Sequence, residues 1–135
     1  MSNKSGFTLI ELMMVVFIIG ILTTITLAVF TSRVREGRRS DAENSLTSMA
    51  LAEERYRTSN TTYGTLAQVW GGVTTSTAGY YTLSISNVSA TGYTLTATAI
   101  GDQANDSESG TNCSPMTYTV SGGTITRSPT ICWPE

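Results

Sequence analysis

Apolar residues are concentrated at the start of the chain. Between Phe7 and Phe30, Glu11 is the only ionisable side chain. As a helix, residues 7–30 would extend about 36 Å, enough to cross a hydrocarbon core of about 30 Å with some tilt. A secretory signal peptide has a shorter apolar core followed by a small-residue cleavage site, and neither feature is present. The pattern therefore predicts a membrane-spanning helix that remains attached to the residues after it.

Residues 31–58 continue as an amphipathic helix. Apolar residues recur mostly at steps of three or four, or at multiples of these, which predicts a stripe packed against a sheet. We interpret the arginines and acids of residues 33–43 as a solvated face, the alternative being contact with neighbouring subunits. Gly20 and Gly37 each cost up to about 1 kcal/mol relative to alanine, and Gly20 is the candidate for local flexure of the helix. The stripe consists of Ala42, Leu46, Met49, Ala50 and Tyr56.

Turn-forming residues and alternating patterns fill the rest of the chain. Residues 59–79 have no long period, which predicts a loop. Residues 81–86 and 93–99 alternate apolar residues with Thr or Ser, as expected for a hairpin with one buried face. A second hairpin surrounds Gly122-Gly123, a pair that tolerates positive φ. Residues 80–135 would therefore form a four-stranded antiparallel sheet packed on the long helix, an α+β fold.

The chain has two cysteines, Cys113 and Cys132, which bracket the second hairpin. In an exported protein such a pair is most simply a disulfide, whereas in the cytosol it would more often stay reduced. Closing a loop of this size is worth roughly 3 kcal/mol in the chain-entropy model. The alternative is two unrelated thiols.

No catalytic or metal-binding constellation is predicted. The chain contains no histidine, so a Ser-His-Asp or Cys-His arrangement is impossible, and the cysteines are too widely spaced for half of a zinc site. Asp102, Asn105, Asp106 and Glu108 offer oxygen ligands, but their spacing does not fit a calcium-binding EF-hand loop. We interpret them as a solvated connection between the hairpins. We expect neither enzymatic activity nor a cofactor or metal.

The charge of the predicted C-terminal domain argues against nucleic acid as a partner. From Asp41 onward, three arginines face eight acids, a net charge of −5. Phosphate contacts dominate affinity for nucleic acids, so this region predicts a poor general DNA binder. A local patch around Arg127 in the second hairpin stays open as an alternative.

The start of the chain resembles a known processing signal. Residues 4–11, KSGFTLIE, followed by the apolar run, are similar to the class III signal of type IV prepilins. The resemblance implies that prepilin peptidase removes a leader of residues 1–6 by cutting between Gly6 and Phe7 and then methylates the new amine of Phe7. It also implies that Glu11 pairs with the N-terminal amine of a neighbouring subunit and so fixes register during assembly.

Later segments resemble the PilE-like minor pilins of Gram-negative bacteria. This resemblance implies the type IV pilin fold and a structural, non-enzymatic subunit that primes or joins pilus assembly. Its partners would be other pilins, both major and minor, prepilin peptidase and the inner-membrane assembly machinery. The chain would span the inner membrane once, with a periplasmic C-terminal domain, before it enters the extracellular pilus. The matching segments are RRSDA at 38–42, AEERY at 52–56, YYTLS at 80–84, YTLTAT at 93–98 and CW at 132–133.

Three other functions compete with this interpretation. A pseudopilin of type II secretion shares the signal but typically holds calcium near its C-terminus in place of a disulfide. A DNA-receptor pilin of the competence type shares the fold. A small binding domain on an ordinary membrane anchor would keep residues 1–6. Surface aromatics are a further open point, because Trp70 and Trp133 either serve adhesion or, as we favour, pack a loop edge and the chain end onto the domain.

Overall fold

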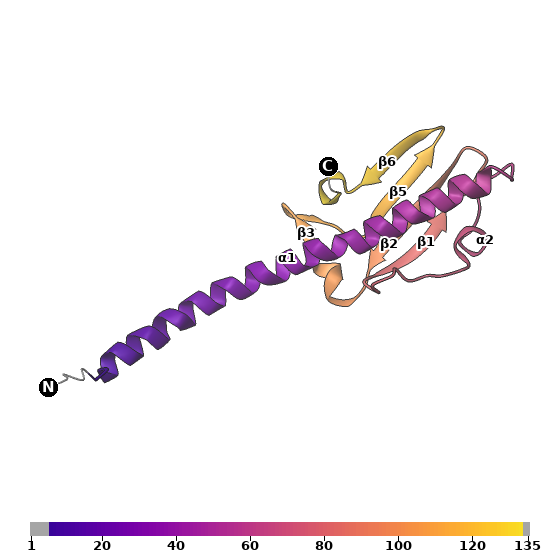
Figure 1. Ribbon diagram of the computed structural model, residues 1–135. Helices are drawn as coiled ribbons and strands as arrows, with labels where there is room; N and C mark the ends of the chain where they lie inside the picture. Colours follow the sequence, from indigo (N-terminus) through magenta and orange to yellow (C-terminus); the bar gives the residue numbers. More distant parts are fainter. Residues whose placement is uncertain (1–5, 134–135) are drawn as a thin grey trace. The chain divides into compact units, whose positions relative to one another are not determined.

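The computed structural model describes residues 6–133, without the side chains of residues 25–28. The chain divides into two compact units, with the boundary between Val34 and Arg35. Helix α1 contributes to both units (Figure 1). The elements are α1 (Leu9–Arg57), α2 (Leu66–Trp70), β1 (Tyr81–Ser86), β2 (Gly92–Ala99), η1 (Gly101–Asn105), β3 (Ser107–Glu108), β4 (Thr111–Asn112), β5 (Met116–Ser121), β6 (Thr124–Ser128) and η2 (Thr130–Cys132).

The first unit consists of the start of α1 and the short segment before it. Its apolar side chains are exposed almost without exception among the residues whose side chains are described. By length and composition this part of the helix is able to cross a membrane, as the sequence pattern predicts. The helix continues through both Gly20 and Gly37, so neither glycine interrupts it. Most of the predicted leader, residues 1–5, lies outside the described part of the chain.

The second unit is a four-stranded antiparallel sheet with the end of α1 packed across one face. The strand order is β1-β2-β5-β6, as Figure 1 shows, which confirms the predicted α+β fold. Four of the five stripe residues of α1 are buried, and Tyr56 is half-buried. Burial of the apolar face drives this packing, because each fully buried large side chain contributes about 1.5–3 kcal/mol. The core consists of Ala42, Leu46, Met49, Ala50, Tyr81, Leu83, Tyr93, Leu95, Ala97, Met116, Tyr118, Val120 and Trp133.

Hydroxyl side chains cover the opposite face of the sheet. The strand register aligns Ser84, Thr96, Thr117 and Ser128 in one row across all four strands. Successive side chains of a strand point to opposite faces, so the alternation read from the sequence becomes one buried and one solvated face. Threonine suits the solvated face because its branched side chain favours strands while its hydroxyl meets water. A second row contains Ser86, Thr94, Thr119 and Thr126.

The short elements α2, η1, β3, β4 and η2 were not predicted. The segment 59–79 is not a simple loop, because α2 forms within it. The Gln68 side-chain oxygen accepts hydrogen bonds from the Thr65 backbone N–H and hydroxyl, at 2.8 and 3.0 Å, and Gly71 at φ +64° ends the helix. The sequence carried the signal, a Thr followed three residues later by Gln, but five residues are too few for a visible period. A two-stranded ladder of β3 and β4 lies between the hairpins.

Candidate functional site

The predicted processing site lies just before α1. Gly6 and Phe7 precede the first helical residue, Leu9, and both are exposed, Phe7 to 81%. Among the described residues, and apart from its chain neighbours, no atom lies within 4 Å of the position that a Gly6 Cβ would occupy. Gly6 and Phe7 are therefore exposed in a segment without regular secondary structure, where a peptidase could reach the bond between them.

Glu11 belongs to the first turn of α1 and contacts Thr8. The Glu11 N–H donates to the Thr8 hydroxyl at 3.3 Å, and the Thr8 N–H donates to a Glu11 carboxylate oxygen at 3.5 Å. This reciprocal arrangement is a capping box, which satisfies donors that a helix start leaves free. The negative charge also complements the positive end of the helix dipole. The sequence pattern Thr8-x-x-Glu11 before an apolar run signals this cap, and our sequence interpretation missed it.

Gly20, the predicted point of flexure, lies inside the exposed apolar part of α1. Apart from its chain neighbours and the backbone of its own helix, no described atom lies within 4 Å of the position that a Gly20 Cβ would occupy. The Thr23 hydroxyl donates to the carbonyls of Ile19 at 2.6 Å and Gly20 at 3.1 Å. Such back-bonding by threonine weakens and bends helices slightly. Flexure at Gly20 stays a prediction, and these two contacts are consistent with it.

In the second unit, Arg39 is a buried cation, contrary to the prediction of a solvated helix face. Its side chain is 8% exposed, and the carboxylate of Asp106 is 3% exposed. Two guanidinium nitrogens of Arg39 donate to the Asp106 carboxylate at 2.6 and 2.9 Å, and a third donates to Glu108 at 2.9 Å. The bonds to Asp106, ahead of those to Glu108, raise the pKa of Arg39. Such bidentate geometry is the strongest form of ion pair in proteins.

Arg35 forms a matching pair one turn earlier on α1. Its guanidinium donates to both carboxylate oxygens of Asp102, at 3.0 and 2.6 Å. The hydrogen bonds from Arg35 lower the pKa of the Asp102 carboxyl. Asp102 and Asp106 are four residues apart, as are Arg35 and Arg39. This shared spacing was the sequence signal that the two segments pair, and reading each segment alone obscured it.

These pairs correct the interpretation of residues 102–108 as a solvated connection. Asp106 is buried, and Gln103 is also buried, with its amide donating to the Arg35 carbonyl and the Tyr81 hydroxyl at 2.9 Å each. The acidic oxygens that calcium would need face guanidinium groups instead. No cluster of three metal-ligating side chains occurs in the described part of the chain.

Asp41 is a second correction to the solvated helix face. Its carboxylate accepts hydrogen bonds from the Ser76 hydroxyl at 2.5 Å and the Ala78 N–H at 3.0 Å. Further along α1, the buried Glu53 accepts a bond from the Gly64 N–H at 2.8 Å. Asp41 and Glu53 therefore both anchor residues 59–79, the segment between α1 and the sheet, to the helix.

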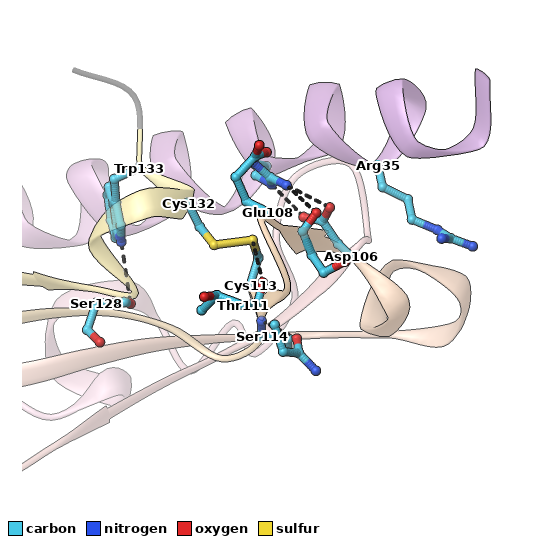
Figure 2. Close-up of a disulfide and its surroundings, with 12 residues drawn as sticks. Arg35, Asp106, Glu108, Thr111, Cys113, Ser114, Ser128, Cys132 and Trp133 are labelled. Carbon is cyan, nitrogen blue, oxygen red and sulfur yellow. Dashed lines mark hydrogen bonds and ion pairs between the residues drawn. A yellow bond between two sulfur atoms is a disulfide. The ribbon is translucent and has the colours of Figure 1, made fainter. Parts of the chain in front are cut away.

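Cys113 and Cys132 form a disulfide, with their Cα atoms 5.6 Å apart. It joins the segment before β5 to η2 after β6, so it staples the two ends of the hairpin as the sequence predicts. Figure 2 shows the disulfide near Asp106 and Glu108. The Cys113 N–H donates to the Asp106 carbonyl at 3.0 Å, which links the disulfide region directly to the buried ion pair.

Arg127 lies on β6 beside two aromatic rings. Its guanidinium carbon is 5.7 Å from the ring centre of Tyr118 and 5.3 Å from that of Trp133. Trp133 is buried and donates its indole N–H to the Ser128 carbonyl at 3.4 Å. Trp133 therefore packs the chain end onto the domain, and the half-buried Trp70 packs against the core in the same way. Arg127 remains an exposed cation on this aromatic support.

Comparison with known families identifies both parts of the chain. Residues 28–117, two thirds of the chain, match a family model described as type IV minor pilin ComP, DNA uptake sequence receptor. The chain belongs to this family of type IV minor pilins. Residues 1–27 match the prokaryotic N-terminal methylation motif. No curated protein matches the chain at a significant level.

Membership in this family accounts for the apolar helix and for the packing of α1 on the sheet. The methylation motif and the exposed apolar helix fit a membrane-anchored pilin. The helix-on-sheet arrangement is that of a type IV pilin, whose role is structural. In this minor pilin the first unit carries the N-terminal methylation motif, and the second unit is an ion-paired and disulfide-bonded head.

Proposed function

We propose that this minor pilin is made as a membrane-held prepilin, is cut between Gly6 and Phe7, and then primes or joins a type IV pilus. The observation that carries the proposal is the arrangement at the start of α1. An accessible Gly6–Phe7 bond is followed at once by a capped helix whose apolar side chains are exposed. Such a surface is stable only in lipid or against other apolar helices.

Glu11 would fix the register of the subunit in the pilus. Among the described residues, the only hydrogen bonds to the Glu11 carboxylate come from the Thr8 N–H and hydroxyl, at 3.5 Å each. A charge in an apolar surrounding is costly unless it is paired, so the methylated amine of Phe7 on a neighbouring subunit would be the better partner. Only one axial offset brings the two together. Gly20 would allow the helix to adjust as it leaves the membrane.

The partners follow from this route. Prepilin peptidase and the inner-membrane assembly machinery act on the membrane-held form, and other major and minor pilins surround it in the filament. The head would lie in the periplasm before assembly and outside the cell afterwards. The disulfide supports an exported head, because disulfides persist in oxidising compartments.

A Gly6→Val variant tests the processing step. Valine puts a branched side chain next to the bond to be cut, so we expect the variant to keep residues 1–6 and to be absent from sheared pili. A Ser5→Ala variant is the matched control and should be processed normally. Normal cleavage and pilus entry of Gly6→Val would contradict the proposed site.

A DNA-receptor role is the second candidate, because the matching family model is described as a DNA uptake sequence receptor. Arg127, an exposed cation supported by two aromatic rings, is the feature that favours it. The net charge of −5 from Asp41 onward opposes it, and we propose that DNA is not a general partner of this pilin.

Fluorescence anisotropy with short duplex DNA at increasing salt separates the two roles. We expect no binding at physiological salt. Salt-sensitive binding that an Arg127→Gln variant loses would instead make this pilin a DNA receptor.

A further inference from the structure

A hollow of about 460 Å³ opens on the flank of the head, between the end of α1 and the β5–β6 hairpin. Its floor is apolar and buried, and includes Ala50, Tyr93 and Tyr118. Its rim includes Leu51 and Ile125, which are 53% and 54% exposed. The hollow exists because α1 leaves the edge strand β6 uncovered, so that every residue of β6 is exposed.

Glu54 places a carboxylate at this hollow. The Tyr63 hydroxyl donates to it at 3.2 Å. Within residues 6–133, no arginine or lysine forms an ion pair with Glu54. Arg57, one turn further along α1, donates to the Asn60 carbonyl at 2.6 Å, and its guanidinium carbon lies 5.8 Å from the ring centre of Tyr63. Among the described residues, Glu54 thus has one neutral hydrogen-bond donor and no ion-pair partner.

The charge of Glu54 acts on the tyrosines that line the hollow. Burial, followed by the charge of Glu54, raises the pKa of both the Tyr63 and the Tyr93 phenol. Three tyrosines line the hollow or border it, but Tyr63 and Tyr118 each have an arginine of the same chain over the ring, and Tyr93 is 1% exposed. The feature that favours a positive ligand is therefore the carboxylate of Glu54, which lies beside exposed apolar side chains.

We propose that this hollow receives an arginine or lysine side chain of another pilin subunit, an inference that rests on the proposed assembly function. The positively charged end would meet the carboxylate of Glu54, while the methylene stem would cover Leu51 and Ile125. An acidic residue among exposed apolar side chains is a better match for an arginine or lysine side chain than for an apolar side chain, because it can pair with the positive charge. Arginine is also among the residues that most often dominate interface energies.

The test is a titration of the full-length chain in detergent micelles, with tyrosine ring signals followed by NMR. The probes are N-acetyl-arginine methylamide and N-acetyl-lysine methylamide, and N-acetyl-citrulline methylamide is the neutral match to arginine. We expect saturable shifts of the Tyr63 and Tyr118 rings with the two cationic probes only. Absence of saturation with both cations, or an equal response to citrulline, would overturn the inference.

Matched variants locate the interaction. Glu54→Gln should weaken binding of the arginine probe roughly fivefold, the effect of a partly exposed ion pair. Tyr63→Phe keeps the ring and should bind nearly as well as the wild type. Glu36→Gln removes an acid of α1 that does not line the hollow and should change nothing. Equal weakening by Glu36→Gln and Glu54→Gln would assign the effect to overall charge and refute the site.

The titration uses the purified chain, so its result does not depend on whether the chain enters pili. Normal pilus entry without probe binding would overturn the hollow alone. Probe binding by a chain that never enters pili would overturn the proposed function and leave the cation site standing.

Discussion

The two units of this minor pilin differ in whether their apolar side chains are exposed or buried. In the first unit, large apolar side chains are exposed, and among the described residues Glu11 forms side-chain hydrogen bonds only with Thr8. In the second unit, apolar side chains are buried between α1 and the sheet, and the buried Arg39 is paired within the same chain. The first unit is therefore complete only in lipid or beside other subunits, whereas the second supplies its own partners.

This difference predicts which property of the protein a substitution in each unit should change. Changes in the first unit should alter membrane insertion and pilus assembly and leave the unfolding of the head unchanged. Changes in the second unit should alter the free energy of unfolding of the head first.

Arg39→Met should have the largest effect on the head. It leaves the carboxylate of Asp106 buried without its cation, and breaking a buried pair in this way costs about 3–5 kcal/mol. Urea unfolding of the full chain in detergent, followed by near-ultraviolet circular dichroism, measures the loss. Arg35→Met is the matched control and should cost much less, because its partner Asp102 is 59% exposed and exposed ion pairs are screened by solvent. Equal losses of unfolding free energy in the two variants would contradict the conclusion that the buried Arg39–Asp106 pair stabilises the head more than the exposed Arg35–Asp102 pair.

Removing the disulfide should come next. Cys113→Ala with Cys132→Ala frees a segment with a sequence separation of 19, which should destabilise the head by about 2–4 kcal/mol. Unfolding of the wild type with and without reductant measures the same quantity independently. Insensitivity of the wild type to reductant would show that the hairpin ends are held by packing and not by the covalent bond.

A smaller effect should depend on pH through Glu53. Burial raises the pKa of this carboxyl, more than the bond from Gly64 lowers it. The folded head therefore disfavours the ionised form, so its stability falls as the pH rises from the ordinary value of about 4.3 through the raised value. Glu53→Gln removes this dependence, and its stability relative to the wild type should rise between about pH 4 and pH 7. Parallel stability curves for the two proteins would show that Glu53 does not titrate differently on folding.

The smallest effect on the head should come from Glu11→Gln. Differential scanning calorimetry should show the same melting of the head as in the wild type, because Glu11 belongs to the first unit and the described residues show it hydrogen-bonded to Thr8. Immunoblots of sheared pili should nevertheless show less of the variant, because the proposed ion pair with the Phe7 amine of a neighbouring subunit would be lost. A shift in head melting, or undiminished entry into pili, would break the division between the two units.

The sequence predicted the features that depend on period. The apolar run, the α1 stripe and the alternating strands each determine an element and its buried face, and the four-stranded sheet followed from them. The disulfide also followed, because the cysteines bracket a hairpin whose ends must be close.

The sequence did not predict features that depend on which distant segments meet. Arg39 and Asp106 each look like a surface charge when read in their own segment, and only the packing of η1 and β3 against α1 buries them. The hollow beside Glu54 escaped prediction for the same reason, since it arises where the helix ends its coverage of the sheet. The first turn of α1 differs, because the pattern Thr8-x-x-Glu11 indicates its capping box from sequence alone and our interpretation overlooked it.

The most direct test of the account is mass spectrometry of sheared, purified pili, measuring the N-terminal mass and the copy number of this chain. For a processed minor pilin, we predict a terminus at methylated Phe7 and a copy number far below that of the major subunit. An intact Met1 terminus, with the protein confined to the membrane fraction, would contradict it.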